Sequence, residues 1–204
     1  MKTINICALI MMAVIVSFMG FCVENIFRAF TKGYIDNRNM CLPFLLGYGI
    51  AVLLVYLLFG LPHRPLFLGT EVCMQNHIYE NVYYYVMLVF CISIGEIALG
   101  SLVEKICGFQ WWDYSRIPLH ITQYTSIPTS MGYSAIVFFF MRYCFEWLKC
   151  FFESWNVKVL VCFSLILGIA LTIDMIYNLY LMYKNGYGKL RWRIKIHHNR
   201  IHKA

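Results

Sequence analysis

Three ionisable residues lie inside long apolar stretches of this sequence, where a charge is costly. Glu96, Arg142 and Asp174 each stand among aliphatic and aromatic residues. Because ionisable side chains are expensive to keep inside a membrane, each is a candidate for function. An ion pair of Arg142 with Glu96 or Asp174 would fix helix packing, whereas a shared polar site would serve a substrate or ion pathway. The sequence leaves both interpretations open, and a third is that these three residues do not contact one another.

Glu96 also has neighbours at helical spacing. Glu96, Gly100 and Glu104 follow one another at intervals of four residues, which places them on one helix face. Two carboxylates on one face could bind a cation or relay a proton. The alternative is that Glu104 is simply solvated at the membrane interface.

A second group of functional side chains falls between the apolar stretches, on one face of the predicted bundle. Asp113, followed by Tyr114 and Ser115, predicts a capped turn next to Trp112, and the alternative is an interfacial anchor. The candidate residues of this face are Glu24, Asn37, Arg38, Glu104, Trp112, Asp113, Tyr114 and Ser115.

No catalytic or metal-binding motif stands in the sequence. The nine cysteines form no CxxC pair and no metal-ligand spacing, and no P-loop, GxSxG or HExxH motif is present. We therefore predict no metal, no cofactor and no catalytic residue. An ATP-driven activity would need a separate ATP-binding subunit.

The composition indicates a membrane protein. Of the 204 residues, 61% are hydrophobic and only 13% charged, against about a quarter charged in soluble domains. This excludes a disordered protein, a nucleic-acid-binding arm and almost any soluble enzyme. So small a globule could not hide this much apolar surface, so we expect an all-α bundle of membrane helices.

Five apolar segments are long enough to cross a bilayer. They are residues 4–24, 41–60, 83–103, 131–152 and 158–183. The predicted organisation is a transmembrane helical domain over 1–183, followed by a basic tail over 184–204. Most of the 17 basic residues fall on the side of that tail, which predicts an outside N-terminus and a cytoplasmic C-terminus. The tail, with its basic cluster, is expected to contact anionic lipid headgroups.

Several motifs on the predicted cytoplasmic side are similar to those of one family. They are Gly20-Phe21-Cys22-Val23-Glu24, Asn37-Arg38, Pro43 with Tyr48-Gly49, and Glu96, Gly100, Glu104-Lys105, Gly108 and Trp112-Asp113-Tyr114-Ser115 with Pro118. Over roughly residues 15–145 the chain resembles the bacterial "putative ABC-transporter type IV" family, also called CmpB-like ABC transporter permeases. Leu42 and Leu46 stand where the family pattern has glycine and proline, and the stretch from His120 to Tyr124 also departs from it.

The resemblance implies a multipass permease-like subunit in a bacterial plasma membrane, and it adds weight to Glu24, Arg38, Glu96, Glu104 and Asp113. Five helices are few for a complete translocation path, so we expect a homodimer or a partner. The ATP-binding subunit would dock around Asn37-Arg38 and Trp111–Ser115. Two other functions stay open: a non-catalytic membrane scaffold or regulator, and an intramembrane lipid-modifying enzyme.

Overall fold

The computed structural model describes residues 2–186 and 190–196, and it is mostly helical. Three helices are long and apolar enough to cross a membrane: α1 (Lys2–Lys32), α3 (His77–Cys107) and α6 (Val157–Asn185). Their ends follow ordinary capping chemistry. Asn76 and Asn156 accept hydrogen bonds from the first turns of α3 and α6, and Gly108 and Gly186 end these helices in left-handed conformations.

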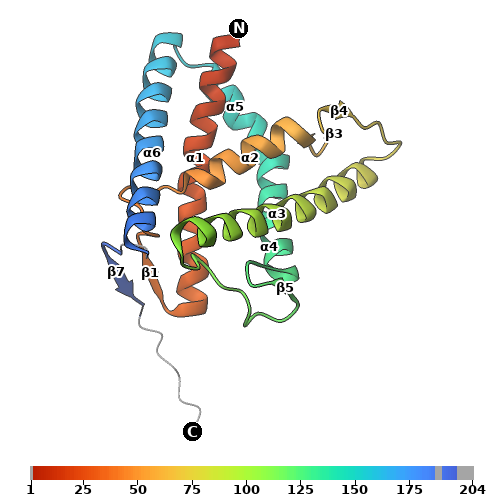
Figure 1. Ribbon diagram of the computed structural model, residues 1–204. Helices are drawn as coiled ribbons and strands as arrows, with labels where there is room; N and C mark the ends of the chain where they lie inside the picture. Colours follow the sequence, from red (N-terminus) through yellow and green to blue (C-terminus); the bar gives the residue numbers. More distant parts are fainter. Residues whose placement is uncertain (1, 187–189, 197–204) are drawn as a thin grey trace.

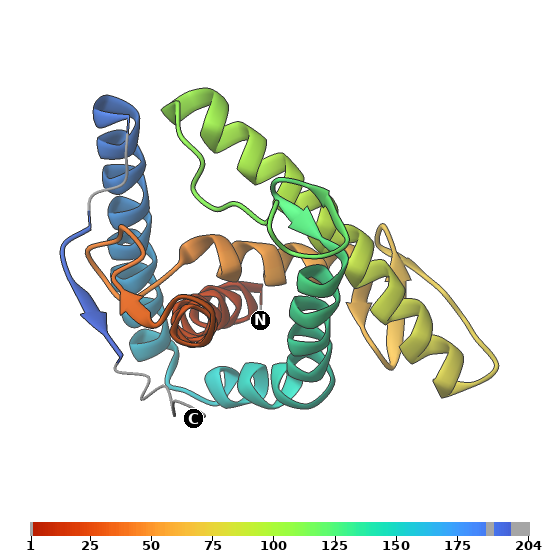
Figure 2. The ribbon, with the colours of Figure 1, turned by 90° about the horizontal axis from the view of Figure 1, so that it is seen from below.

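The remaining helices are shorter or interrupted. Helix α2 (Leu46–Phe59) has 14 residues, which span about 21 Å at 1.5 Å per residue and fall short of a hydrocarbon core of about 30 Å. The fourth apolar segment is a run of α4 (Ile127–Phe139), the π-helical turn η1 (Phe140–Cys144) and α5 (Phe145–Glu153). A π-turn bends a helix, and this run bends between α4 and α5 (Figure 2).

Helix α1 is the centre of the bundle. Figure 2 shows it enclosed by α6, α2 and the α4–α5 run, and α1 packs against α2, α5 and α6. Of its most apolar 18-residue stretch 56% is buried, against 17% for α3 and 22% for α6. Helices α2 and α3 lie across α1 in Figure 1, and α3 packs chiefly on α4.

Short strands join the helices. β1 (Tyr34–Asp36) pairs antiparallel with β7 (Arg193–Lys195), with Ile35 opposite Ile194. β2 (Gly60–Leu61), β3 (Arg64–Phe67) and β4 (Thr70–Glu71) form a small antiparallel sheet before α3. β5 (His120–Thr122) and β6 (Thr125–Ser126) form a hairpin leading into α4.

All five predicted apolar segments are helical, although their bounds differ from the prediction. Helix α2 begins at Leu46 rather than at 41, because Pro43 lacks an N–H and the N–H groups of Cys41 and Leu42 donate to Asp174. Part of the basic tail, residues 190–196, lies against β1, whereas His197, His198 and the residues beyond them lie outside the described chain. The number of membrane crossings and the orientation remain predictions.

Two glycines allow α1 and α2 to approach closely. A Cβ atom at Gly49 would overlap the Ala13 carbonyl oxygen, and one at Gly20 would overlap the Tyr48 ring. Small residues let helix backbones meet in this way in membrane bundles.

Substitution of Gly49 tests this contact. We expect Gly49→Ala to lower the free energy of unfolding by about 1–3 kcal/mol, because a well-packed interface cannot take an added methyl group. Gly47→Ala is the matched control, because its Cβ would meet open space. Thermal unfolding of both variants in the same detergent checks this, and equal melting temperatures would contradict the proposed contact.

Candidate functional site

Five polar side chains from three helices and two loops meet beside the C-terminal half of α1. We call Glu24, Arg38, Tyr48, Tyr114 and Tyr133 the Glu24 cluster. The Tyr48 hydroxyl donates to Glu24 Oε1 at 3.0 Å, and Arg38 Nη2 lies 3.3 Å from Glu24 Oε2. The Tyr48 and Tyr133 ring centroids are 6.4 Å apart. Both carboxylate oxygens of Glu24 are therefore engaged.

Arg38 is held by a strained turn. Arg38 and Asn39 have φ values of 51° and 66°, in the left-handed region that non-glycine residues rarely occupy. The Arg38 N–H donates to Asp36 Oδ1 at 2.9 Å, and the Asn37 side chain donates to the Met40 carbonyl at 2.7 Å. Such strain persists only where the surroundings enforce it, and it gathers at functional sites.

Asp36 anchors this turn to α1. Its side chain is 0% exposed and accepts from Arg28 at 2.8 Å, and its N–H donates to Asn25 Oδ1 at 2.8 Å. Arg193 of β7 lies 3.8 Å from the same carboxylate and over the Tyr34 ring. The end of α1, β1 and β7 thus fix the position of Arg38.

Several buried donors in this region have no acceptor. Arg38 is 5% exposed, yet its Nε and Nη1 atoms have no hydrogen-bond partner among the described residues. The same holds for the Trp111 indole N–H, whereas the Tyr133 hydroxyl lies close to the hydroxyls of Tyr48 and Tyr114. Buried polar groups are nearly always paired, so an unpaired set needs an explanation.

The segment from Trp112 to Ser115 delivers Tyr114 into the Glu24 cluster. The Trp112 indole donates to the Tyr124 carbonyl at 2.8 Å, and Asp113 Oδ1 accepts from the Ser115 N–H at 2.8 Å. That backbone hydrogen bond lowers the pKa of the exposed Asp113 carboxyl. Burial raises the pKa of the Tyr114 phenol far above its usual value, and the nearby Tyr133 and Glu24 add to this effect. Tyr114 is therefore a protonated donor at all ordinary pH values.

Glu96 lies next to the cluster without a cation. Its Oε2 accepts from Thr125 at 2.5 Å and from Ser130 at 3.1 Å, and these two hydroxyls are 2.8 Å apart. No Lys, Arg or His nitrogen lies within 4.0 Å of it in the described part of the chain. A carboxylate held by two hydroxyls can take up a proton or a small cation.

Glu104 lies about two helical turns beyond Glu96 on α3 and holds the β5–β6 hairpin in place. It accepts from the Tyr124 hydroxyl and, at 3.1 Å, from the Gln123 amide. A Cβ at Gly100 would overlap the Tyr124 ring, so this glycine admits the hairpin. Glu104 is therefore a structural partner of the loop.

Glu96, Arg142 and Asp174 do not contact one another in the described structure. Asp174 accepts from the Cys41 N–H at 3.1 Å, the Leu42 N–H at 3.3 Å and the Asn178 amide at 2.9 Å. Arg142, on η1, forms no ion pair with a described residue. Of the three, Glu96 alone adjoins the Glu24 cluster.

The sequence reasoning missed Tyr133, Thr125 and Ser130. Ser126, Ser130 and Ser134 follow at intervals of four, and all three are buried. A polar stripe at helical spacing in an apolar segment was the signal that could have placed this face of α4 against Glu96.

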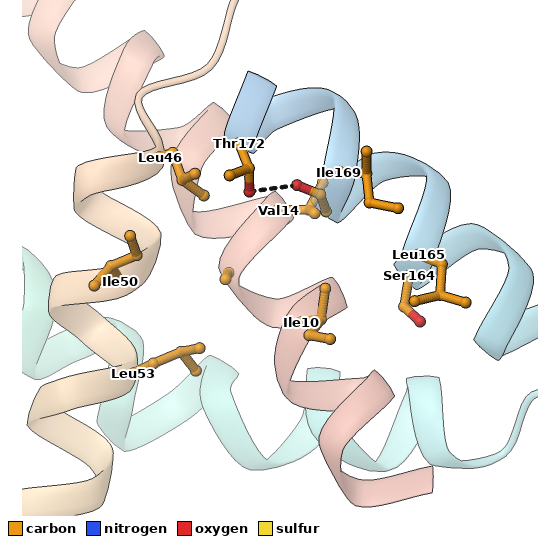
Figure 3. Close-up of a pocket in the computed structure, with 11 residues that line it drawn as sticks. Ile10, Val14, Leu46, Ile50, Leu53, Ser164, Leu165, Ile169 and Thr172 are labelled. Atoms are coloured by element: carbon orange, nitrogen blue, oxygen red, sulfur yellow. Dashed lines mark hydrogen bonds between the residues drawn. The ribbon is translucent and has the colours of Figure 1, made fainter. Parts of the chain in front are cut away.

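A separate apolar groove of about 310 Å³ lies between α1, α2 and α6 (Figure 3). Its two hydroxyls are satisfied within α6, because Thr172 donates to the Gly168 carbonyl at 2.7 Å and Ser164 to the Val161 carbonyl at 3.0 Å. The groove offers no free polar group. Among the described residues no cluster of three metal-ligating side chains occurs either.

Of the motif residues, Glu24, Arg38, Tyr48 and Tyr114 meet in the Glu24 cluster. A family model described as Putative ABC-transporter type IV matches residues 11–179, most of the chain. The chain belongs to this family. Comparison with curated proteins and with solved structures gave no significant match. Membership together with three apolar, membrane-length helices makes this type IV chain a membrane protein related to transport.

Removal of Glu24 tests the buried ion pair. We expect Glu24→Gln to lower the free energy of unfolding by about 3–5 kcal/mol, because it leaves a buried guanidinium without its counter-charge. The double variant Glu24→Gln/Arg38→Met is expected to recover part of this loss. Glu71→Gln, at an exposed position on β4, is the control. Equal unfolding temperatures for Glu24→Gln and the control would contradict the importance of the pair.

Proposed function

We propose that this chain is the membrane-embedded, permease-like subunit of an ABC-type transport complex in a bacterial plasma membrane. The Glu24 cluster with Glu96 is its polar site for the solute or a coupled ion. Two observations support this proposal: the Glu96 carboxylate has no cation partner among the described residues, and the buried Arg38 has two nitrogens without a hydrogen-bond partner there. Such groups are costly in a membrane and mark substrate or ion pathways.

The separate ATP-binding subunit docks on the loop between α3 and β5. Asp113, Ser115 and Arg116 are exposed there, whereas Asn37 and Arg38 are buried and face the protein interior. The docking surface is therefore the exposed part of this loop. A homodimer would supply further helices for a translocation path, and the tail, in the cytoplasm, contacts anionic lipid headgroups.

A scaffold or regulator is the second candidate function. The hydrogen bonds of Glu104, Asp174 and Trp112 hold loops of the same chain in place. Glu104 and Trp112 belong to the family motif, so this favours a structural role for part of that motif. The two functions differ in what neutralising Glu96 does. A scaffold loses assembly, whereas a permease keeps assembly and loses flux.

Glu96→Gln is the decisive variant for transport. We expect it to abolish ATP-dependent solute accumulation, because the amide cannot bind a proton or cation, while the expression level stays normal. Accumulation is measured in inverted membrane vesicles by untargeted mass spectrometry. Glu71→Gln is expected to accumulate solute like the unmodified protein. Accumulation by Glu96→Gln at the control level would exclude Glu96 from the mechanism, and no accumulation by the unmodified protein would overturn the permease proposal.

Capture from native membranes tests the ATP-binding partner. We expect a nucleotide-binding subunit to co-purify in mild detergent at a fixed ratio, and Arg116→Glu to reduce its recovery at least several-fold, because the charge on the docking loop is reversed. Arg64→Glu, exposed on β3, is the matched control. Recovery of the chain alone would contradict docking, and equal loss in both variants would place the docking surface elsewhere.

A further inference from the structure

We propose that Arg38 binds a phosphate oxyanion within the Glu24 cluster, as free phosphate or as the headgroup of a phospholipid. This deepens the proposed function, on which it rests, by giving the chemical class of what the polar site takes. The donors left unpaired in the cluster carry the inference.

In the Glu24 cluster the carboxylate oxygens already have partners, whereas two nitrogens of Arg38 have none among the described residues. Glu24 Oε1 already accepts from Tyr48, and Oε2 forms an ion pair with Arg38. Arg38 uses Nη2 for this contact, so Nε and Nη1 remain unpartnered on a side chain that is 6% exposed. The Tyr133 hydroxyl lies in the same cluster, close to the hydroxyls of Tyr48 and Tyr114. A group that pairs with the free Arg38 nitrogens must therefore bring acceptors.

The position of Arg38 is fixed by contacts of the turn that carries it. Its left-handed backbone at φ 51° is enforced by Asp36, which is itself fully buried and paired with Arg28. A flexible arginine in solvent would avoid both the strain and the burial. Strain of this kind is retained where the surrounding structure enforces it, and it gathers at functional sites.

Basic residues lie near the exposed loop and beside the Arg38 turn. Lys32 and Arg116 both act electrostatically on Asp113, which places these basic side chains near one another at the exposed loop. The Arg191 N–H donates to Asn37 Oδ1 at 3.2 Å, so this residue lies beside the Arg38 turn. Clustered charge of one sign attracts a counter-ion and raises its local concentration.

Phosphate fits these donors better than a neutral ligand. Arginine-to-phosphate hydrogen bonds are charge-assisted and about twice as strong as neutral ones. A phosphate carries several oxygens in different directions, and the donors reach the cluster from α4 and from the β1–α2 loop. Lysine would be a poorer substitute, because its single nitrogen cannot replace a guanidinium.

Binding is measured on the purified full-length chain in nanodiscs, so it does not depend on transport or on an ATP-binding subunit. One arm titrates sodium phosphate against sodium chloride at equal ionic strength in phosphatidylcholine nanodiscs. The second arm compares phosphatidic acid with phosphatidylcholine nanodiscs in the absence of phosphate. We expect a rise in melting temperature in one arm, and that arm identifies the source of the oxyanion.

Two variants then assign the binding to Arg38. Arg38→Lys keeps the charge facing Glu24, and we expect it to weaken binding more than tenfold. Tyr133→Phe removes the hydroxyl that α4 places near Tyr48 and Tyr114, and we expect it to lose about tenfold in affinity. Tyr143→Phe, at a 70% exposed position, is the control.

The proposal is overturned if neither arm raises the melting temperature, or if Arg38→Lys and Tyr133→Phe both bind as well as the control. Such a result would leave the Glu96→Gln flux experiment and the partner capture unaffected. Loss of flux in Glu96→Gln without any phosphate binding would therefore show a permease whose solute is not a phosphate compound.

Discussion

An apolar bundle can hold polar side chains only where they find partners, and the Glu24–Arg38 ion pair is the centre around which this bundle satisfies that requirement. Glu24 comes from the central helix, and it joins α2 through Tyr48 and the β1–α2 turn through Arg38. That turn in turn depends on Asp36, Arg28 and the β1–β7 pair. Helix α2, the β1–α2 turn and the β1–β7 pair are thus linked, directly or through one intermediate, to a single carboxylate. Removing one partner of such a pair costs far more than the pair contributes to stability, because a charge is left buried.

Close approach of backbones makes this polar centre geometrically feasible. Gly20 and Gly49 bring α1 and α2 together so that Tyr48 reaches Glu24, and Gly100 brings the β5–β6 hairpin onto α3 so that Tyr124 reaches Glu104. The glycines and the polar residues of the family motif therefore serve one arrangement. The glycine supplies the space, and the polar side chain one turn away supplies the hydrogen bond.

The sequence predicted the helices well, because each is a long apolar run and apolar length is a local property. It also placed Glu24, Arg38, Tyr114 and Glu96 among the functional residues. It did not place their partners, since the contact of Glu96 with Ser130 and Thr125 joins α3 to residues about 30 positions further along the chain, in α4 and β6. The sequence offered Arg142 as a partner of Glu96 or Asp174, but an ionisable residue in an apolar stretch says nothing of which helix faces which. Asp174 instead accepts hydrogen bonds from the backbone N–H groups of residues 41 and 42. These N–H groups need an acceptor because the chain before Pro43 is not helical, and residue types alone do not reveal that need.

The hairpin connects the exposed loop mechanically to Glu96. Trp112 and Tyr114 bond to the backbone of residues 124 and 123, and Thr125, the next residue, donates to Glu96. Because Thr125 is 0% exposed and bonded also to Ser130, it cannot move with the loop without giving up a hydrogen bond to Glu96. Displacement of the loop by a docked subunit would therefore alter the surroundings of the one carboxylate that lacks a cation partner in the described chain. A carboxylate in an apolar bundle responds strongly to the loss of a hydrogen-bond donor, since its charged form is then less favoured. The arrangement thus gives an event at the loop surface a direct physical route to the protonation or ion binding of Glu96.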